Sequence, residues 1–283
     1  MSAEQQLWQV AAVVAVLLGL GLIEWRRGEF FSPQATHEDN RLDLAMALLM
    51  PAVSAVVLRA TLAACEAVMP MQRGAWAHWS WWEMAAVLLI ADDFTQYWWH
   101  RLSHQWARLW PLHRAHHSAS YMGVRIVYRN NIFYYAMMPG LWLSGVLIYL
   151  GFGWVYVAYT VTKMAVIIGA HSSLRWDEPL LRRRWLHPLL WVLERTLSTP
   201  ATHFAHHALR EDDGVGHHSG NFGNLLFLWD VLFGTARLSR RYPPDYGLED
   251  DRQFGPESWW TQITYPLTRS HRAQTVLGRQ RNL

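Results

Sequence analysis

Eight histidines in this chain follow spacings that place side chains on one face of a helix, and a ninth stands apart from them. His100 and His104 are four residues apart, so on a helix their Cβ atoms would lie about 5–6 Å apart. Six more form two groups with the spacing i, i+3, i+4, and His171 stands alone at the end of an apolar stretch. The two groups are His113, His116 and His117, then His203, His206 and His207.

This spacing points to metal chemistry. Imidazole suits iron, copper, nickel and zinc, and one ion takes at most about four to six donors, so nine converging nitrogens imply two ions. Neutral ligands leave the ions highly charged, which suits binding and activation of dioxygen. A zinc protease helix carries a glutamate between its paired histidines, and none stands there here. Carboxylates could orient the rings through their other N–H groups. The candidates are Asp92, Asp93 and Asp230.

The composition indicates that a membrane positions these histidines. Of 283 residues, 52% are hydrophobic and 17% charged, whereas a soluble domain has about a quarter of its residues charged. Cys65 is the single cysteine, which excludes an internal disulfide framework and a thiolate-cluster metal site. Lys163 is the one lysine among 25 basic residues, as in a GC-rich genome. The basic balance does not by itself argue for nucleic acid, and we expect no such partner.

Hydropathy predicts several membrane spans, since a crossing needs about 20 mainly apolar residues. The last apolar stretch is twice that length and breaks at Gly151-Phe152-Gly153, which predicts a hairpin of two spans. The stretches are Leu7 to Trp25, a signal anchor rather than a removable signal peptide, Leu44 to Met69, Trp81 to Trp99, and Ile132 to Ala170. The predicted number of membrane spans is therefore four or five.

The arginine distribution favours five spans with the N-terminus outside. The basic loops and every histidine cluster then face the cytoplasm. If Leu44 to Met69 were re-entrant, this topology would invert. We therefore predict an all-α fold: a multi-pass membrane helical bundle with a cytoplasmic helical cap that carries a histidine-rich dimetal site. The expected location is a bacterial inner membrane, with the metal site on its cytoplasmic face.

Several other side chains carry narrower expectations. Lys163 lies inside a span and should snorkel or pair with a buried carboxylate, and Arg129 should help close the site or meet a lipid headgroup. His187 is expected to be structural, and His217 and His218 to be loop residues that can line an entrance. Tryptophans at the span ends should anchor the protein in the interface. They are Trp76, Trp79, Trp81, Trp82, Trp98, Trp99, Trp106 and Trp110.

Four motifs in order resemble those of the membrane-bound fatty acid hydroxylase/sterol desaturase superfamily. They are DxxxYWxHRxxH from Asp93, LWxxHxxHHS from Leu109, TPxxHxxHH from Thr199 and NFGNLLxLWDxLFGT from Asn221 to Thr235. The resemblance covers about half of the chain. It implies a histidine-ligated di-iron centre that uses O2 and external electrons to hydroxylate or desaturate an unactivated C–H bond of a lipid.

By that resemblance the eight motif histidines are iron ligands, and His171 matches a ninth. The implied division is 1–79 for N-terminal membrane spans, 80–236 for a catalytic domain with further spans, and 237–283 for a soluble tail. The segment HPLLWVLERTLSTP before the third motif is similar to bacterial sterol-desaturase-like and alkylglycerol monooxygenase-like branches, some of which have histidine in place of Thr202.

The chain has no dinucleotide, flavin or haem-binding motif, so a separate ferredoxin, rubredoxin or cytochrome-type donor must supply the electrons. We expect it to dock near Arg182-Arg183-Arg184, where acidic carriers would be steered. The lipid is open among sterol, fatty acyl, alkylglycerol and carotenoid types, as is the choice between hydroxylation and desaturation. The alternatives are a zinc or divalent-cation transporter, whose ligands should lie near the bilayer midplane, and a zinc hydrolase.

Overall fold

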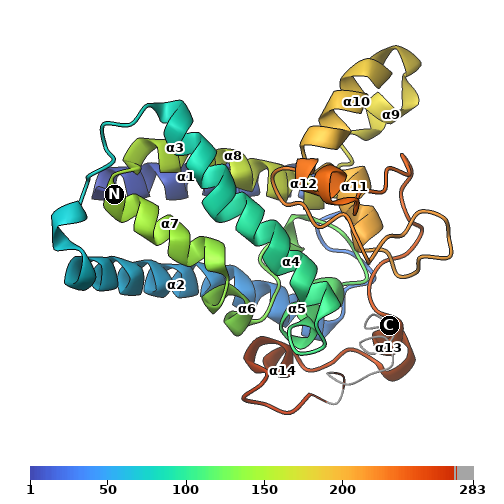
Figure 1. The fold of residues 1–283 in the computed structure, drawn as a ribbon. Helices are drawn as coiled ribbons and strands as arrows, with labels where there is room; N and C mark the ends of the chain where they lie inside the picture. Colours follow the sequence, from blue (N-terminus) through green and yellow to red (C-terminus); the bar gives the residue numbers. More distant parts are fainter. Residues whose placement is uncertain (271, 273–283) are drawn as a thin grey trace.

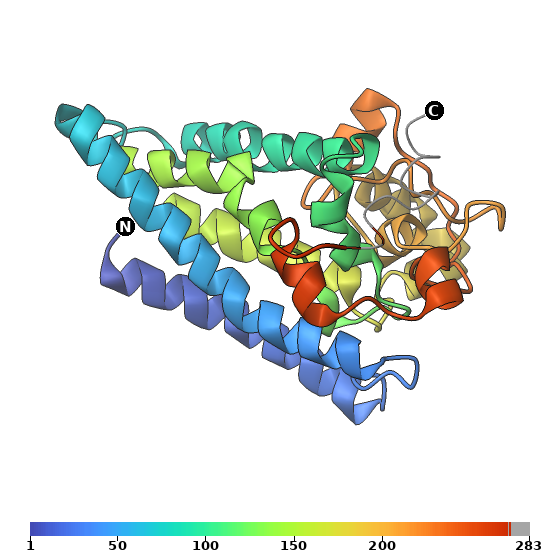
Figure 2. The same ribbon diagram turned by 90° about the horizontal axis from the view of Figure 1, so that it is seen from below.

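The computed structural model describes residues 1–270 and Arg272, and all of its regular elements are helices. The predicted all-α fold is therefore confirmed for the described part of the chain; the rest of the tail, including His271, lies outside the described residues. The long helices run side by side as an elongated bundle, and the short helices of the C-terminal half gather at one end of it (Figures 1 and 2).

Three helices are long and apolar enough to cross a membrane, which makes this an integral membrane protein. Ser2 and Thr36 cap the first two of them through hydrogen bonds to the main chain of the first turn. The helix expected to begin at Leu44 therefore begins earlier, at His37, directly after its capping residue Thr36. The three helices are α1 (Ala3–Arg26), α2 (His37–Val68) and α8 (Gly153–His171).

The other two expected spans are helical but less regular. The segment from Trp81 consists of α3 (Trp81–Leu88), a π-helical turn η2 (Leu89–Phe94) and α4 (Thr95–Gln105), which follow one another without a break. Helix α7 (Pro139–Leu150) has 12 residues, and Gly151, with φ of +117°, turns the chain into α8. The predicted hairpin break is confirmed, while the total of five spans stays a prediction.

The π-helical turn directs two adjacent carboxylates to different neighbours, as such turns often do near functional sites. Asp92 pairs with Lys163 of α8, with 2.6 Å between its Oδ2 and Nζ, so the second of the two expectations for this lysine is confirmed. Asp93 faces the loop that precedes α12. Gly140 of α7 packs against Asp92 so closely that a Cβ there would collide with the carboxylate.

Polar contacts join the span ends on the side where the short helices gather. Glu24, near the end of α1, accepts hydrogen bonds from Ser172 Oγ at 2.8 Å and Ser173 N at 2.9 Å, directly after α8. It also accepts from Val124 N at 3.2 Å. Helix α1 packs beside α8, and α2 beside α7. Glu24 thereby fixes the end of α1 to the segment after α8 and to η3 (Val124–Ile126), at the end of the bundle where the short helices lie.

The short elements complete that end of the molecule. Part of the C-terminal tail is tied to it, because Arg114 pairs with Asp250 and Asp251, and α14 packs against α2 and α5. The elements are η1 (Pro70–Gln72), α5 (Trp110–His117), η3 (Val124–Ile126), α6 (Ile132–Ala136), α9 (Glu178–Arg182), η4 (Arg184–Leu186), α10 (His187–Thr196), α11 (Pro200–His206), α12 (Leu228–Phe233), α13 (Glu249–Phe254) and α14 (Trp259–Thr264).

Two tryptophans differ from the interfacial role expected of them. Trp81, Trp82 and Trp106 are exposed, as anchors should be, but Trp99 and Trp110 are buried. Trp110 lies beside the rings of His104 and His117, at 5.4 and 5.7 Å between centroids. Its indole therefore forms part of the wall around the histidines.

Candidate metal centre

The nine predicted histidines come together from four helices at the end of the bundle. Each is at most 6% exposed. Helix α4 carries the first motif and α5 the second. Helix α8 ends at His171. The third motif lies on α11, where Thr199 caps the helix and Pro200 occupies its first turn, as the sequence predicts.

The histidines form two groups, and in each group the candidate donor atoms lie within 4.8 Å of one another. The five-histidine group consists of His100, His104, His113, His117 and His206, and the four-histidine group of His116, His171, His203 and His207. The groups adjoin, because the rings of His117 and His207 stack with centroids 4.3 Å apart. This arrangement has the shape that two neighbouring ions would need.

Helical spacing explains how the second and third motifs divide between the groups. Residues i and i+4 lie on one stripe of a helix, whereas residue i+3 is turned away to its side. His113 and His117 thus join the five-histidine group while His116 joins the other. On α11, His203 and His207 stay together and His206 faces the opposite group.

The distances between ring nitrogens test whether these residues fit a metal ion. Ligands at about 2.0–2.1 Å from an ion, at angles of about 90–110°, have nitrogens about 2.9–3.4 Å apart. In the five-histidine group the Nε2 atoms of His206 and His100 are 3.0 Å apart. In the four-histidine group His203 and His171 are at 2.9 Å, and His171 and His116 at 3.4 Å. The residues therefore fit.

Main-chain carbonyl groups fix the orientation of four rings. The Nδ1 atoms of His100, His116 and His206 lie 2.7–3.0 Å from the carbonyl oxygens of Phe222, Arg129 and Gly220. His171 Nδ1 lies 2.8 Å from the carbonyl oxygen of Ile167. Because a carbonyl oxygen accepts, Nδ1 must carry the proton in each ring. Each Nε2 then presents a lone pair, and lone pairs facing one another at about 3 Å are stabilised by a cation between them.

Burial keeps the rings neutral, as ligands must be. Desolvation lowers the pKa of His100 to about 4. The pKa values of five other rings lie well below the ordinary value, first because of desolvation and then because neighbouring imidazoles would repel a charge. These rings belong to His116, His117, His203, His206 and His207.

Asp93 and Asp230 bind the loop behind His100, whereas a direct bond to a ring N–H group was expected of them. Asp230 accepts hydrogen bonds from Phe222 N at 2.8 Å and Gly223 N at 2.6 Å. Asp93 accepts from Leu225 N at 3.2 Å and, further along, from the Trp229 indole at 2.8 Å. The two carboxylates thus hold the loop whose Phe222 carbonyl accepts from His100, which the sequence did not reveal.

The same loop explains the NFGNLL motif. Asn221 adopts a φ of +57°, a conformation that asparagine tolerates better than most residues. Its amide Nδ2 donates to the carbonyl oxygen of Thr202 on α11 at 2.9 Å. At Gly223 a Cβ would lie 2.9 Å from Asp230 Oδ2. The loop is therefore packed tightly between α11 and α12.

Arg129 is buried rather than placed at lipid headgroups. Its guanidinium pairs with Asp39 at 2.6 Å and Asp43 at 3.2 Å, near the start of α2. It also donates through Nε to the carbonyl oxygen of Ala115 at 2.8 Å. Arg129 thus ties α2 to the helix of the second motif, while its own carbonyl orients His116.

The remaining candidates lie outside the two histidine groups. His187 Nε2 is 3.1 Å from the carbonyl oxygen of Leu181, and His217 Nε2 is 3.1 Å from that of Thr235. His218 bonds to the carbonyl oxygen of Ala208. Each of these three rings is thus bonded to a main-chain carbonyl group. The sequence analysis did not identify two further residues beside the centre. Asn130 Nδ2 lies 3.3 Å from His113 Nδ1, and the ring of Tyr134 stacks on that of His113.

Fold and site together define an integral membrane helical protein with a buried candidate site for two metal ions. The chain belongs to the fatty acid hydroxylase family, whose model matches residues 84–235, more than half of the chain. The resemblance to the fatty acid hydroxylase/sterol desaturase superfamily is therefore confirmed.

The chain is also similar to curated proteins named alkylglycerol monooxygenase. It is 26% identical to that of Danio rerio over 161 residues and 25% identical to that of Homo sapiens over 162 residues. These alignments cover 56% of this chain and 30% of each relative, so the chain spans less than a third of the relatives' length in the match. No solved structure matches.

Proposed function

We propose that this protein is a di-iron, O2-dependent enzyme that hydroxylates or desaturates an unactivated C–H bond of a lipid. The observation that carries the proposal is the pair of adjoining, buried histidine groups in a member of this family. The five-histidine group would hold one iron and the four-histidine group the other. Bound iron would supply the activation of O2 and the oxidation of the C–H bond.

The protein's own residues would orient the ligands and exclude water. Carbonyl groups keep Nδ1 protonated and leave Nε2 free to bind, so no ring has to rearrange when metal arrives. Burial of all nine rings limits access of bulk water to the reacting centre. Asp93 and Asp230 would be positioning residues, because they hold the loop that bears the Phe222 carbonyl.

Among the possible substrates, the relatives favour an alkylglycerol-type lipid, since the matched proteins carry the name alkylglycerol monooxygenase. Sterol, fatty acyl and carotenoid chains remain the competitors to be compared with it. We further propose that residues 80–236 form the catalytic unit, that a separate ferredoxin, rubredoxin or cytochrome-type protein supplies electrons, and that the metal site faces the cytoplasm of a bacterial cell.

Two alternatives would use the same histidines differently. A cation transporter needs ligands along a path near the bilayer midplane. These histidines lie on α4, α5 and α11 and at the end of α8, and Figure 1 shows α5 and α11 where the bundle passes into the short helices. A zinc hydrolase needs a carboxylate base beside an open metal position, while the nearest predicted carboxylates are engaged with main-chain amides. The oxygenase therefore has the stronger support.

Metal analysis separates these proposals. The protein is purified from iron-replete cells and its iron and zinc are measured per chain, beside a His116→Ala variant. We expect about two irons in the native protein and fewer in the variant. Zinc alone in the native protein would contradict the oxygenase.

Lipid profiling then identifies the reaction. Lipids are compared among the native strain, a deletion strain and the deletion strain carrying His116→Ala, with and without an added alkylglycerol. A lipid that lacks an oxygen atom or a double bond in both mutant strains would be the missing product. Identical lipid profiles in all three strains would count against a lipid-oxidising role.

A further inference from the structure

We propose that helices α10 and α12 lie in the headgroup layer of the membrane, on the side of the bilayer that holds the metal site. Both helices have inverted polarity: each turns apolar side chains outward and buries its acidic residue against the protein. A helix on a water-exposed surface shows the opposite pattern. The inference is independent of the reaction that the metal site performs.

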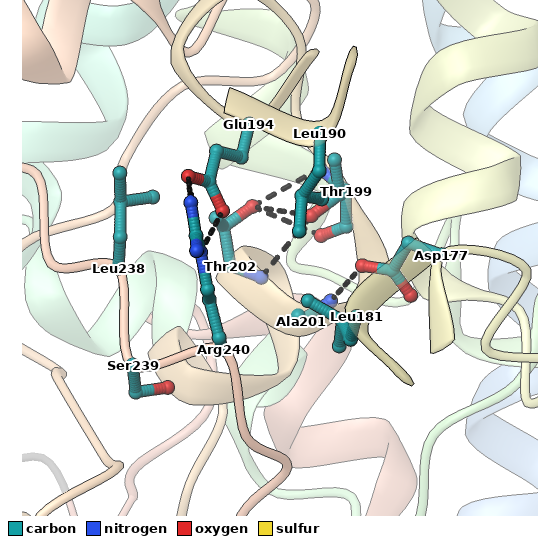
Figure 3. A pocket seen from close by; sticks show the side chains of 10 residues that line it. All are labelled: Asp177, Leu181, Leu190, Glu194, Thr199, Ala201, Thr202, Leu238, Ser239 and Arg240. Atoms are coloured by element: carbon teal, nitrogen blue, oxygen red, sulfur yellow. Dashed lines mark hydrogen bonds and ion pairs between the residues drawn. The ribbon is translucent and has the colours of Figure 1, made fainter. Parts of the chain in front are cut away.

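Helix α10 shows the inversion most clearly. Leu189, Trp191 and Val192 are 57%, 54% and 54% exposed, while Glu194 is 3% exposed. Glu194 points inward to Arg240, with 2.6 Å between Oε1 and Nη2, in a pocket beside α11 (Figure 3). Leaving large apolar side chains in water while a charge is buried is unfavourable on both counts. A lipid environment removes the first of these costs.

Helix α12 repeats the pattern next to it. Leu232 is 62% and Phe233 41% exposed, whereas Asp230 is fully buried. Helices α10 and α12 contact one another, so their exposed apolar residues lie on neighbouring elements. Contiguous exposed apolar surfaces of this kind mark interaction sites.

This surface is continuous with a segment expected to cross the membrane. The ring of Phe233 lies 5.9 Å from that of Phe94 and 5.2 Å from that of Trp98, both in the predicted third span. Figure 1 shows α9 and α10 projecting sideways from the bundle next to α11 and α12. A sideways projection that starts at the end of a span reaches the plane of the bilayer surface.

The charges next to this surface also fit lipid headgroups. Arg182, Arg183 and Arg184 are exposed and lie directly before Trp185, which is 74% exposed. Arginine with tryptophan is typical of segments at the membrane interface, where the guanidinium meets phosphate and the indole meets the acyl boundary. An acidic carrier protein would account for the arginines alone, whereas a lipid surface accounts for the apolar side chains as well.

The contact with lipid would lie close to the histidines. Helix α10 ends at Thr196, and α11, which carries the third histidine motif, begins at Pro200. Helix α12 in turn holds, through Asp230, the loop whose Phe222 carbonyl orients His100. This location suits a lipid that enters sideways from the bilayer.

Site-directed spin labelling tests the proposal in the full-length protein. Cys65→Ala removes the native thiol, and a nitroxide is attached after Leu189→Cys or Val192→Cys, with Asp212→Cys in an exposed polar loop as the matched control. The proteins are placed in nanodiscs of phosphatidylcholine and phosphatidylglycerol. Accessibility to O2 and to a water-soluble nickel complex is then measured, with monodisperse elution as the check of folding.

We expect labels at positions 189 and 192 to be more accessible to O2 than to nickel, and the label at 212 to show the reverse. If the labels at 189 and 192 are as accessible to nickel as the label at 212, the proposal is wrong. It is equally wrong if those labels lose access to nickel only when an acidic electron carrier is added, since the surface would then be a protein docking site.

Discussion

Replacing Asp230 with asparagine should loosen the five-histidine group without unfolding the protein. Asp230 accepts from Phe222 N at 2.8 Å, from Gly223 N at 2.6 Å and from Thr235 Oγ1 at 2.6 Å. Asparagine has the same shape but offers one oxygen, so its NH2 group must face one of the two amide N–H groups. The Phe222 carbonyl, which orients His100, should then move.

The expected cost follows from these contacts. One buried N–H without an acceptor costs about 1–3 kcal/mol, and two charge-assisted hydrogen bonds become neutral ones at about 1 kcal/mol each. Burial raises the pKa of Asp230, and the neutral amide regains part of that desolvation. We therefore expect the free energy of unfolding to fall by about 2–4 kcal/mol and metal affinity to fall by about 10–100-fold.

The assay is competition with a chelator, followed by metal analysis and thermal unfolding. One of the two metals should leave Asp230→Asn much faster than it leaves the native protein. Asp245→Asn is the matched control, because Asp245 pairs with Arg252 on the surface, where such pairs contribute about 0–1 kcal/mol. Unchanged chelator resistance in Asp230→Asn, or equal loss of both metals from a protein that is still folded, would refute the role assigned to the loop.

Three further predictions address other parts of the structure. His116→Ala should remove the ion of the four-histidine group and leave about one metal per chain, measured by elemental analysis. Lys163→Met leaves Asp92 buried without its partner and should destabilise the protein by about 3–5 kcal/mol; adding Asp92→Asn should restore part of this in a thermal unfolding assay. In the metal-free protein His100 has a pKa of about 4, below its value of about 6.5 in the unfolded chain, so the unfolded state binds more protons between these values. Stability should therefore be full above about pH 6.5 and fall as the pH drops toward 4, whereas a flat thermal stability over this range would contradict the neutral, buried ring.

Short sequence patterns predicted much of the fold, because the residues that determine these features lie close together in the chain. The break at Gly151, the start of α11 at Thr199 and the need of Lys163 for a buried carboxylate are all visible in short stretches. The π-helical turn at Leu89–Phe94 is not, since it shifts the main-chain register without a distinctive residue. Neither is the true extent of α2, whose cap at Thr36 precedes the apolar stretch.

The candidate site divides in the same way. Spacing identifies eight of the nine histidines, but the acceptors of four ring N–H groups are main-chain carbonyl oxygens, which no residue type in a sequence indicates. The bond from His100 to the Phe222 carbonyl joins residues 122 positions apart. The sequence singles out Asp93 and Asp230 near the rings, but the groups that they bind are main-chain amides, which only packing brings within reach.

The distribution of charge connects this site to the membrane. Three of the buried acids lie beside elements that carry or orient the histidines: Asp93 precedes α4, Asp230 holds the loop behind His100, and Glu194 lies just before α11. On α10 and α12 the apolar side chains face outward toward the acyl boundary, as on helices that lie in the membrane interface, and the carboxylates face inward. Asp93 and Asp230 there hold the main chain of the loop behind His100, and Glu194 binds the side chain of Arg240. The membrane environment thereby favours an ordered site before any metal is bound.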